Sequence, residues 1–297
     1  MPQIDFQIQT TYSDGRDTPE QIAVMAKDAG LLAYAVTDHD TILGIAPSLL
    51  AAQYLGIHCI PGVELSVNVH GKLNHVLGLG IDHNNEELLF VIAKQIEARK
   101  RACIEALPRI NQRLRGEGLL EIDQAHLRNE PDTTFSLPGL MQYLARQGIV
   151  ENNDAAQKIV SGLLVYDFPL YVTEAIEAIH RAGGIASLSH PLAPRISLKS
   201  LSSERSRHIE LLEELKSDGL DALEISATGH SDEENAFLRD IAEREGYLLT
   251  YGTDWHGTLK NTGVSIKNYL PYYDGVFAGI KISDKENQIL AKVLKYG

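Results

Sequence analysis

The stretch IDFQIQTTYSDGRDTPEQIAVMAKDAGLLAYAVTDHD, residues 4–40, predicts a strand, a helix and a second strand. Each strand is a short apolar run that ends in polar residues. The helix between them is expected to begin after Thr18, whose side chain forms a capping box with Gln21, and to end at Gly30. A strand, helix and strand in this order predict two parallel strands joined by a crossover helix.

The same alternation extends outward from this stretch. It continues to about residue 84, is replaced by helical patterns, and returns further along the chain. We therefore expect an α/β barrel-like domain formed by residues 1–84 and 167–297, with a helical insertion at 85–166. The insertion is predicted to start with a long helix from Glu86 that is broken near Pro108.

Composition narrows the functional classes. The chain has 297 residues and a formal net charge of −13, which argues against an extended nucleic-acid surface because such surfaces are normally basic. Cys59 and Cys103 are the only cysteines, too few for a disulfide framework or a thiolate zinc site. The absence of a signal-peptide pattern and of an apolar run of about 18 residues predicts a cytoplasmic protein without membrane contact.

Several polar residues fall where a predicted strand finishes. They are Asp14, Asp38, His39, Glu64, His75, His190, His230, Asp254 and His256. A single histidine near a strand end is more often a hydrogen-bonded structural residue, but strand ends of a parallel barrel gather on one face, where active sites lie. Histidine and carboxylate groups without cysteine suit divalent manganese, iron or zinc. The common position of these residues favours a metal site, and their number suggests more than one ion.

In these segments the sequence resembles the polymerase and histidinol phosphatase (PHP) superfamily of metal-dependent phosphoesterases. The likeness is greatest to its nucleoside 3′,5′-bisphosphate phosphatases and 5′-to-3′ exoribonucleases. The motifs that carry it are TTYSDG (10–15), VTDHDT (36–41), PGVELS (61–66), NHVLGLGID (74–82), LSHP (188–191) and GTDWHG (252–257). The resemblance implies a distorted (β/α)₇ barrel with up to three metal ions at the strand ends.

The resemblance also implies three sets of metal ligands. The first set is residues 7 and 9, Glu64 and Asp254; the second is Glu64, His75 and His190; the third is Asp14, His39 and His256. In the second set Glu64 would bridge to the first ion. All the required residue types are present except at positions 7 and 9.

The opening motif departs from the family pattern. The pattern Asp-x-His-x-His-Thr stands here as DFQIQT, so the two histidines are replaced by Gln7 and Gln9. Residues two apart on a strand share a face, but an amide has no imidazole nitrogen and its neutral oxygen is a poorer ligand for a transition metal. We therefore expect the first metal position to be weak or empty, with two ions of manganese, zinc or iron rather than three.

Two functions follow from this pattern. The first is a working phosphoesterase that hydrolyses a phosphate monoester or a terminal phosphodiester of a nucleotide or short oligonucleotide. The alternative is a degenerate or disabled relative that binds a phosphorylated ligand without turning it over. A purely structural or partner-binding α/β protein would leave the histidine and carboxylate set unexplained.

A basic run lies at the start of the predicted insertion. Residues 94–115 hold seven basic and two acidic side chains. Such a run is commonly a solvated helix face, but Arg99 and Arg101 are also candidates to bind a phosphate remote from the reacting one. The predicted substrate is thus a small phosphorylated molecule such as a nucleotide or the end of a short RNA.

Two further residues are candidates near the reacting phosphate. Arg195 follows His190 by five positions, and a guanidinium matches phosphate geometry with paired hydrogen bonds. His230 is a candidate general acid toward the leaving oxygen or a further phosphate contact. Alternatively, His230 belongs to a helix N-terminal turn capped by Ser231.

Overall fold

The computed structural model describes residues 3–164, 169–194, 196–225, 229–257, 280–281 and 292. In that part of the chain eight strands form one sheet in the order β7-β6-β5-β4-β3-β2-β1-β8. The strands are β1 (Gln3–Ile8), β2 (Ala33–Val36), β3 (His58–Val69), β4 (Lys72–Leu79), β5 (Ile185–Leu188), β6 (Ala222–Ile225), β7 (Leu248–Tyr251) and β8 (Ile280–Lys281). Strand β4 is antiparallel to β3 and β5, and β8 is antiparallel to β1, whereas the other neighbours are parallel.

The two ends of the β1 to β7 set meet just beyond β7. The Gln9 N–H donates to the Trp255 carbonyl (2.8 Å) and the Trp255 N–H donates to the Gln7 carbonyl (3.2 Å), while Ile8 and Trp255 form a parallel bridge. The seven strands are therefore nearly closed, which confirms the predicted barrel-like α/β fold. The barrel is irregular because β3 turns directly back into β4 without a crossover helix.

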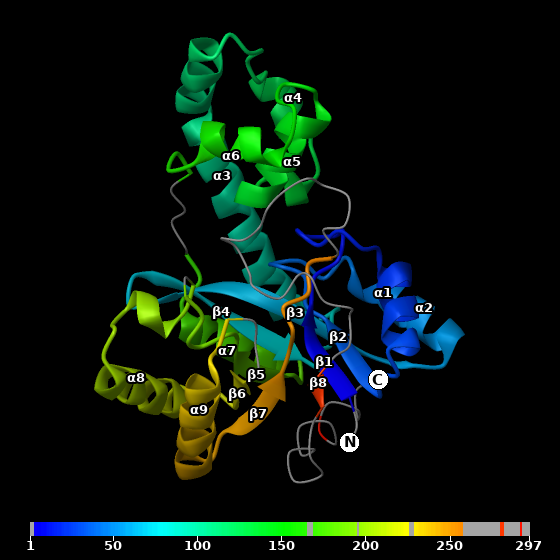
Figure 1. Ribbon diagram of the computed structural model, residues 1–297, viewed down its shortest axis with the longest axis vertical. Coiled ribbons are helices and arrows are strands. Elements are labelled where there is room, and N and C mark those ends of the chain that lie inside the picture. Colours follow the sequence, from blue (N-terminus) through cyan, green and yellow to red (C-terminus); the bar gives the residue numbers. More distant parts are fainter. Residues whose placement is uncertain are drawn as a thin grey trace. The chain divides into compact units, whose positions relative to one another are not determined.

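Helices pack beside this sheet, with α1 and α2 near β1 to β3 and α9 near β6 and β7 (Figure 1). They are α1 (Pro19–Asp28), α2 (Ile45–Leu55), α7 (Val172–Arg181), α8 (Arg205–Ser217) and α9 (Asp232–Glu245), with a 3₁₀ turn at Leu198–Ser200. As predicted, Thr18 and Gln21 form the capping box that starts α1. This helix start depends on local contacts, which is why sequence alone was enough to predict it.

Strand β1 is buried on both faces. Its apolar side chains Ile4, Phe6 and Ile8 are buried, and Ile8 belongs to a core cluster with Tyr34 and Trp255. Residues two apart share a face of a strand, so the opposite face carries the polar side chains. On that face Gln7 reaches the carboxylate of Glu64, so the barrel interior is polar near this end of β1.

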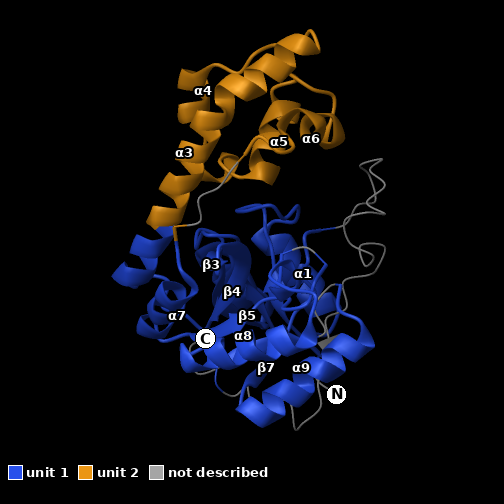
Figure 2. Ribbon diagram, turned by 90° about the vertical axis from the view of Figure 1, so that its left-hand side faces the viewer, with its two compact units in different colours: residues 1–92, 170–297 blue, residues 93–169 orange. Residues whose placement is uncertain are grey.

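The chain forms two compact units, residues 1–92 with 170–297, and residues 93–169 (Figure 2). The predicted insertion at 85–166 overlaps the second unit. The helices of this part of the chain are α3 (Glu86–Gly116), whose first turns belong to the first unit, α4 (Gln124–Arg128), α5 (Leu137–Arg146) and α6 (Asn153–Val160), with a 3₁₀ turn at Asp132–Thr134. The second unit has a core of its own, which includes Cys103, Ile110, Phe135 and Leu140.

The predicted break near Pro108 is wrong. Helix α3 continues through Pro108 to Gly116. A proline inside a helix removes one backbone donor, but α3 buries Ile110 and Leu114 in the core beyond it, and that packing favours the continuous helix. No helix in the described part of the chain has the length and apolar character needed to cross a membrane.

Candidate metal centre

The first unit brings the predicted ligand positions together. The side chains are Gln7, Gln9, Asp14, His39, Glu64, His75, His190, Asp254 and His256, which are linked by hydrogen bonds or ion pairs. They come from β1, β3 and β4, from the turn after β1, and from the segments that follow β2, β5 and β7. Residues from distant parts of the chain therefore face one another at one end of the barrel.

The prediction that all of them follow strand ends is wrong for His75 and Glu64. His75 lies in the first half of β4, opposite Ser66 of β3. An antiparallel strand brings its beginning to the edge at which its parallel neighbours finish, so His75 still enters the centre. Glu64 lies in the middle of β3 because this strand is long and extends past that edge.

Three atoms form a compact set suited to an ion at the second position. Glu64 Oε1 lies 2.9 Å from His75 Nδ1 and 3.3 Å from His190 Nε2, and the two imidazole nitrogens are 3.3 Å apart. Tetrahedral ligands at a metal distance of about 2.0–2.1 Å are separated by about 3.3 Å. The donor set and its spacing therefore fit a divalent ion, with one coordination position left open.

A second set, which corresponds to the third position, surrounds Asp14. Its Oδ1 lies 3.3 Å from His256 Nε2 and 4.0 Å from His39 Nε2, and the three ligand atoms lie within 4.8 Å of one another. Asp14 Oδ1 is buried and makes no hydrogen bond within the described residues. A buried carboxylate oxygen between two imidazoles also fits a divalent cation.

The first position is built differently. Gln9 Nε2 donates to Glu64 Oε2 at 2.6 Å, and Gln7 Nε2 donates to Glu64 Oε1 at 3.2 Å. Amide nitrogens are hydrogen-bond donors and do not bind cations. The residues at this position therefore do not fit a metal ion in the observed arrangement.

The facing histidines and carboxylates of the centre shift one another's pKa values. Burial raises the pKa of Glu64, but the facing His39 and His75 outweigh this effect and hold it well below its usual range. Burial lowers the pKa of His256, but the Asp14 and Asp254 carboxylates raise it to about 10. In the metal-free chain His256 is thus protonated at neutral pH, and an ion at the third position must displace that proton.

The backbone around the centre is strained. Among the described residues other than glycine, Asp40, His190 and Asp254 have left-handed φ values of 47°, 31° and 55°, and the only other one is His70. Such conformations are unfavourable for residues with a side chain and cluster at functional sites. Three of the four lie at or beside the candidate centre, which supports a functional role for it.

Two buried residues of the centre were not predicted. Ser189 accepts a hydrogen bond from Gln7 Nε2 at 2.7 Å and donates to Glu64 Oε1 at 3.2 Å. Glu224 accepts a hydrogen bond from the His190 backbone N–H at 2.8 Å, and burial raises the pKa of Glu224 to about 8. The signal for Glu224 was a lone charged residue inside the buried strand ALEI.

Comparisons with known proteins identify the family. The PHP domain model matches residues 5–164, more than half of the chain.

The chain belongs to the PHP domain family.

This PHP domain protein is 29% identical over 257 residues to a 5′-3′ exoribonuclease of Haemophilus influenzae, covering 85% of this chain and 89% of that relative. It is 26% identical over 265 residues to a 3′,5′-nucleoside bisphosphate phosphatase of Chromobacterium violaceum, covering 86% and 88%. The structure of a Bifidobacterium adolescentis protein assigned as a metal-dependent phosphoesterase matches with a TM-score of 0.76 and 26% identity, covering 100% and 96%. The PHP domain protein is thus homologous to phosphoesterases over most of its length.

Both ring nitrogens of His230 have partners in this PHP domain protein. Its Nε2 accepts a hydrogen bond from the Leu192 N–H at 3.0 Å, and its Nδ1 lies 3.3 Å from Asn235 Oδ1. Burial lowers the pKa of His230 to about 4, so the ring is neutral at pH 7. As foreseen in the alternative, Ser231 caps α9 directly after it. This arrangement suits a histidine that positions the segment after β5.

Two of the three predicted phosphate contacts lie in the second unit. Arg99 and Arg101 are on α3 within the second unit, and Arg101 is exposed. Arg195 lies outside the described residues. Their role as phosphate contacts therefore stays a prediction.

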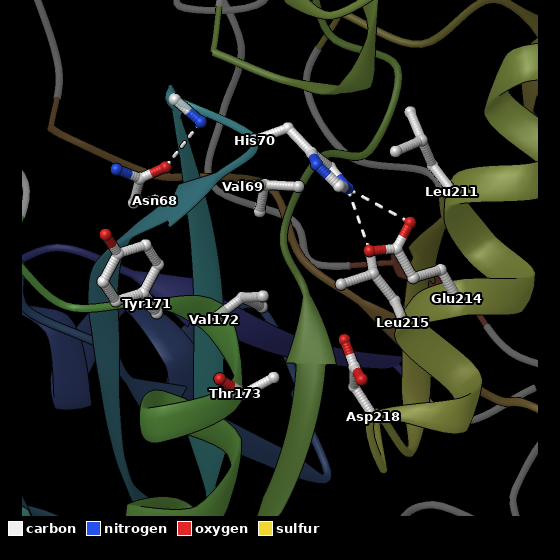
Figure 3. Close-up of a pocket in the computed structure, with 11 residues that line it drawn as sticks. Asn68, Val69, His70, Tyr171, Val172, Thr173, Leu211, Glu214, Leu215 and Asp218 are labelled. Atoms are coloured by element: carbon white, nitrogen blue, oxygen red, sulfur yellow. Dashed lines mark hydrogen bonds and ion pairs between the residues drawn. The ribbon is translucent and has the colours of Figure 1, made fainter.

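A separate hollow lies beside the β3–β4 turn, between α7 and α8 (Figure 3). It has a volume of about 370 Å³ and is lined by residues that include Tyr171 and Leu211. At its rim His70 Nε2 lies 2.9 Å from Glu214 Oε1. None of its described lining residues is a candidate metal ligand, so the hollow is distinct from the metal centre.

Proposed function

We propose that this PHP domain protein is a metal-dependent phosphoesterase that hydrolyses a phosphate monoester or a terminal phosphodiester of a nucleotide or short oligonucleotide. The observation that carries the proposal is the close approach of Glu64, His75 and His190, whose ligand atoms are 2.9–3.3 Å apart. The homology to an exoribonuclease and to a nucleoside bisphosphate phosphatase supports the nucleotide class of substrate.

In this proposal two ions are held, one at the second position and one at the third. Glu64 Oε1, His75 Nδ1 and His190 Nε2 would bind the second ion, and Asp14, His39 and His256 the third. Bound divalent ions supply activation of a water and stabilisation of charge on the phosphoryl oxygens.

The protein contributes orientation to this chemistry. Glu224 holds the His190 backbone N–H, which fixes the left-handed residue that presents its imidazole to Glu64. The depressed pKa of Glu64 keeps its carboxylate ionised and able to bind a cation at neutral pH.

We propose Arg195 as the clamp for the reacting phosphate, and Arg99 and Arg101 as contacts for a remote phosphate. For His230 the general-acid hypothesis is kept beside the positioning role.

A second candidate function is binding of a phosphorylated ligand without turnover. The observation that favours it is the loss of imidazoles at Gln7 and Gln9, which leaves the first position without a metal ligand from β1. The two candidates share the ligand class and differ in whether the remaining ions are enough for hydrolysis.

Metal content and turnover measured on the same protein separate these functions. The chain should be purified without chelator, and bound metals counted by mass spectrometry. Nucleoside 3′,5′-bisphosphates and 5′-phosphorylated RNA dinucleotides are then offered with added manganese, zinc or iron. We expect about two ions per chain and release of phosphate or nucleotide. His75→Ala/His190→Ala should lose turnover and the ion at the second position, about one per chain, and keep the ion held by Asp14, His39 and His256.

Bound ions and ligand without any turnover would support the binding function instead. A chain that holds no ion under any of these conditions would contradict the metal-dependent proposal altogether.

A further inference from the structure

The carboxylate of Glu64 is enclosed by neutral donors on the side that faces β1. Gln9 Nε2 lies 2.6 Å from Oε2. Gln7 Nε2 lies 3.2 Å from Oε1 and 2.7 Å from Ser189 Oγ, which itself donates to Oε1. The four side chains are at most 2% exposed. Water therefore competes little with these hydrogen bonds, which gives them a larger effect than exposed ones.

The orientation of the amides argues against a cation between them. A glutamine that binds a cation presents its oxygen to it, yet both amides present nitrogen to Glu64. The Gln9 oxygen is instead 3.3 Å from the Ser13 hydroxyl. Turning both oxygens toward a shared ion would break the Gln7 bond to Ser189 and both bonds to Glu64.

We propose that Gln7 and Gln9 form an amide clamp that takes the place of the first metal ion. The clamp holds Glu64 by hydrogen bonds in the metal-free chain, in which Gln9 occupies Oε2 with a short bond and Gln7 makes a longer bond to Oε1. Oε1, which also faces His75 and His190, is the oxygen offered to an ion. A carboxylate that would otherwise bridge two ions thus becomes a ligand of one. The inference concerns the chain before any substrate binds and does not depend on turnover.

The clamp predicts a metal-free centre that is already ordered. Without donors or a cation, a buried carboxylate such as Glu64 would be strongly unfavourable. With the clamp, the donors come from the chain itself, and chelation should leave Glu64 satisfied on its Oε2 side. Replacing the amides by imidazoles should restore a site that needs its own ion.

Two double variants test the clamp. Gln7→Met/Gln9→Met keeps side-chain length but removes the donors and cannot bind a hard divalent ion. Gln7→His/Gln9→His removes the amides and restores two imidazole ligands. Gln53→Met, at an exposed position of α2, is the matched control. Melting temperatures are measured with EDTA and with manganese chloride, and bound metal is counted for each protein.

In EDTA we expect the Met pair to melt about 5 °C or more below the parent chain, because at least two hydrogen bonds to a buried charge are lost. Manganese should not recover that loss. The His pair should also melt lower in EDTA, but manganese should raise its melting temperature and add about one ion per chain relative to the parent. The Gln53→Met control should match the parent.

Equal melting of the Met pair and the parent in EDTA would overturn the clamp. A manganese anomalous peak within bonding distance of the Gln7 or Gln9 oxygen in crystals of the parent chain would also overturn it. If no variant binds any ion at the second and third positions, the proposed function fails while the EDTA comparison still decides the clamp. The two failures are therefore distinguishable.

Discussion

The two oxygens of Glu64 lie in different surroundings within one carboxylate. Oε1 lies 2.9 Å from His75 Nδ1 and 3.3 Å from His190 Nε2, whereas the nearest donor to Oε2 is the Gln9 amide at 2.6 Å. Imidazole nitrogens can exchange a proton for a metal ion, but an amide nitrogen cannot. The difference teaches that Oε1, although Gln7 and Ser189 also donate to it, faces two close imidazoles that suit an ion, whereas Oε2 is held at short distance by an amide.

Glu64→Gln should break this comparison most severely, because it removes the charge on which both sides depend. We expect loss of the ion at the second position and a fall in phosphoesterase activity of more than about 100-fold, the upper range for disturbing residues around a metal. Metal counting and steady-state kinetics check this. Glu243→Gln, at an exposed position of α9, is the control. Full metal content in Glu64→Gln would show that Glu64 is not a ligand.

His75→Gln should sharpen the comparison by replacing one of the two imidazoles at Oε1 with an amide, beside the Gln7 amide that already donates there. An amide nitrogen beside Oε1 would donate to Glu64, as Gln9 does on the other side. We expect about one ion fewer per chain. The free energy of unfolding in EDTA should fall by less than the free energy of metal binding at the second position. Calorimetric metal titration of the variant and the parent measures both sites. An unchanged second binding event would mean that imidazole is not what separates the two sides.

His230→Gln tests whether His230 donates a proton to the leaving oxygen or only positions the segment after β5. Both ring nitrogens have partners, and burial lowers the pKa of His230 to about 4. A positioning role predicts a similar fall in kcat, about tenfold or less, for 4-nitrophenyl phosphate and for a nucleotide. A general acid contributes about 10²–10⁴-fold to the rate. Its loss would lower kcat for the nucleotide, which has the poor leaving group, and not for 4-nitrophenyl phosphate. That selective loss would favour the general-acid hypothesis.

Glu224→Gln should change how the metal-free chain responds to pH. Burial raises the pKa of Glu224 from an ordinary 4.5 to about 8. In the parent, the unfolded state loses this proton near pH 4.5 and the folded state near pH 8, so stability falls as pH rises between these values. In this range the free energy of unfolding of the parent should fall by up to about 1.4 kcal/mol for each pH unit. The glutamine variant has no proton to lose and should not show this fall. Urea unfolding in EDTA at pH 5 and pH 9 measures it; parallel curves for both proteins would contradict the shift.

Thr18→Ala should have the smallest effect and should not distinguish the two sides of Glu64. It removes the capping box of α1, which lowers the free energy of unfolding by about 1 kcal/mol. Metal content should stay at the parent value. Denaturant unfolding and metal counting check both expectations, and a lost ion would mean that α1 affects the centre through the turn before it.

Much of the centre could be predicted from the sequence. The motifs around His39, Glu64, His190 and Asp254 are short and lie beside predicted strands, so their meeting follows from the barrel. Glu224 and Ser189 were missed because each looks like an ordinary strand or loop residue until its partner across the barrel is known. Long-range hydrogen bonds, such as that between the Glu224 carboxylate and the His190 backbone, leave no local pattern in the sequence.

The sequence by itself determined the helix starts, the strand alternation and the replacement of histidine by Gln7 and Gln9, because capping and side-chain alternation involve residues close along the chain. Only the tertiary structure decided which end of each amide faces Glu64. The partners that fix this choice are 55 positions from Gln9 and, for Ser189, 182 positions from Gln7. An amide can donate or accept equally well, so its role is set by the groups that folding places around it.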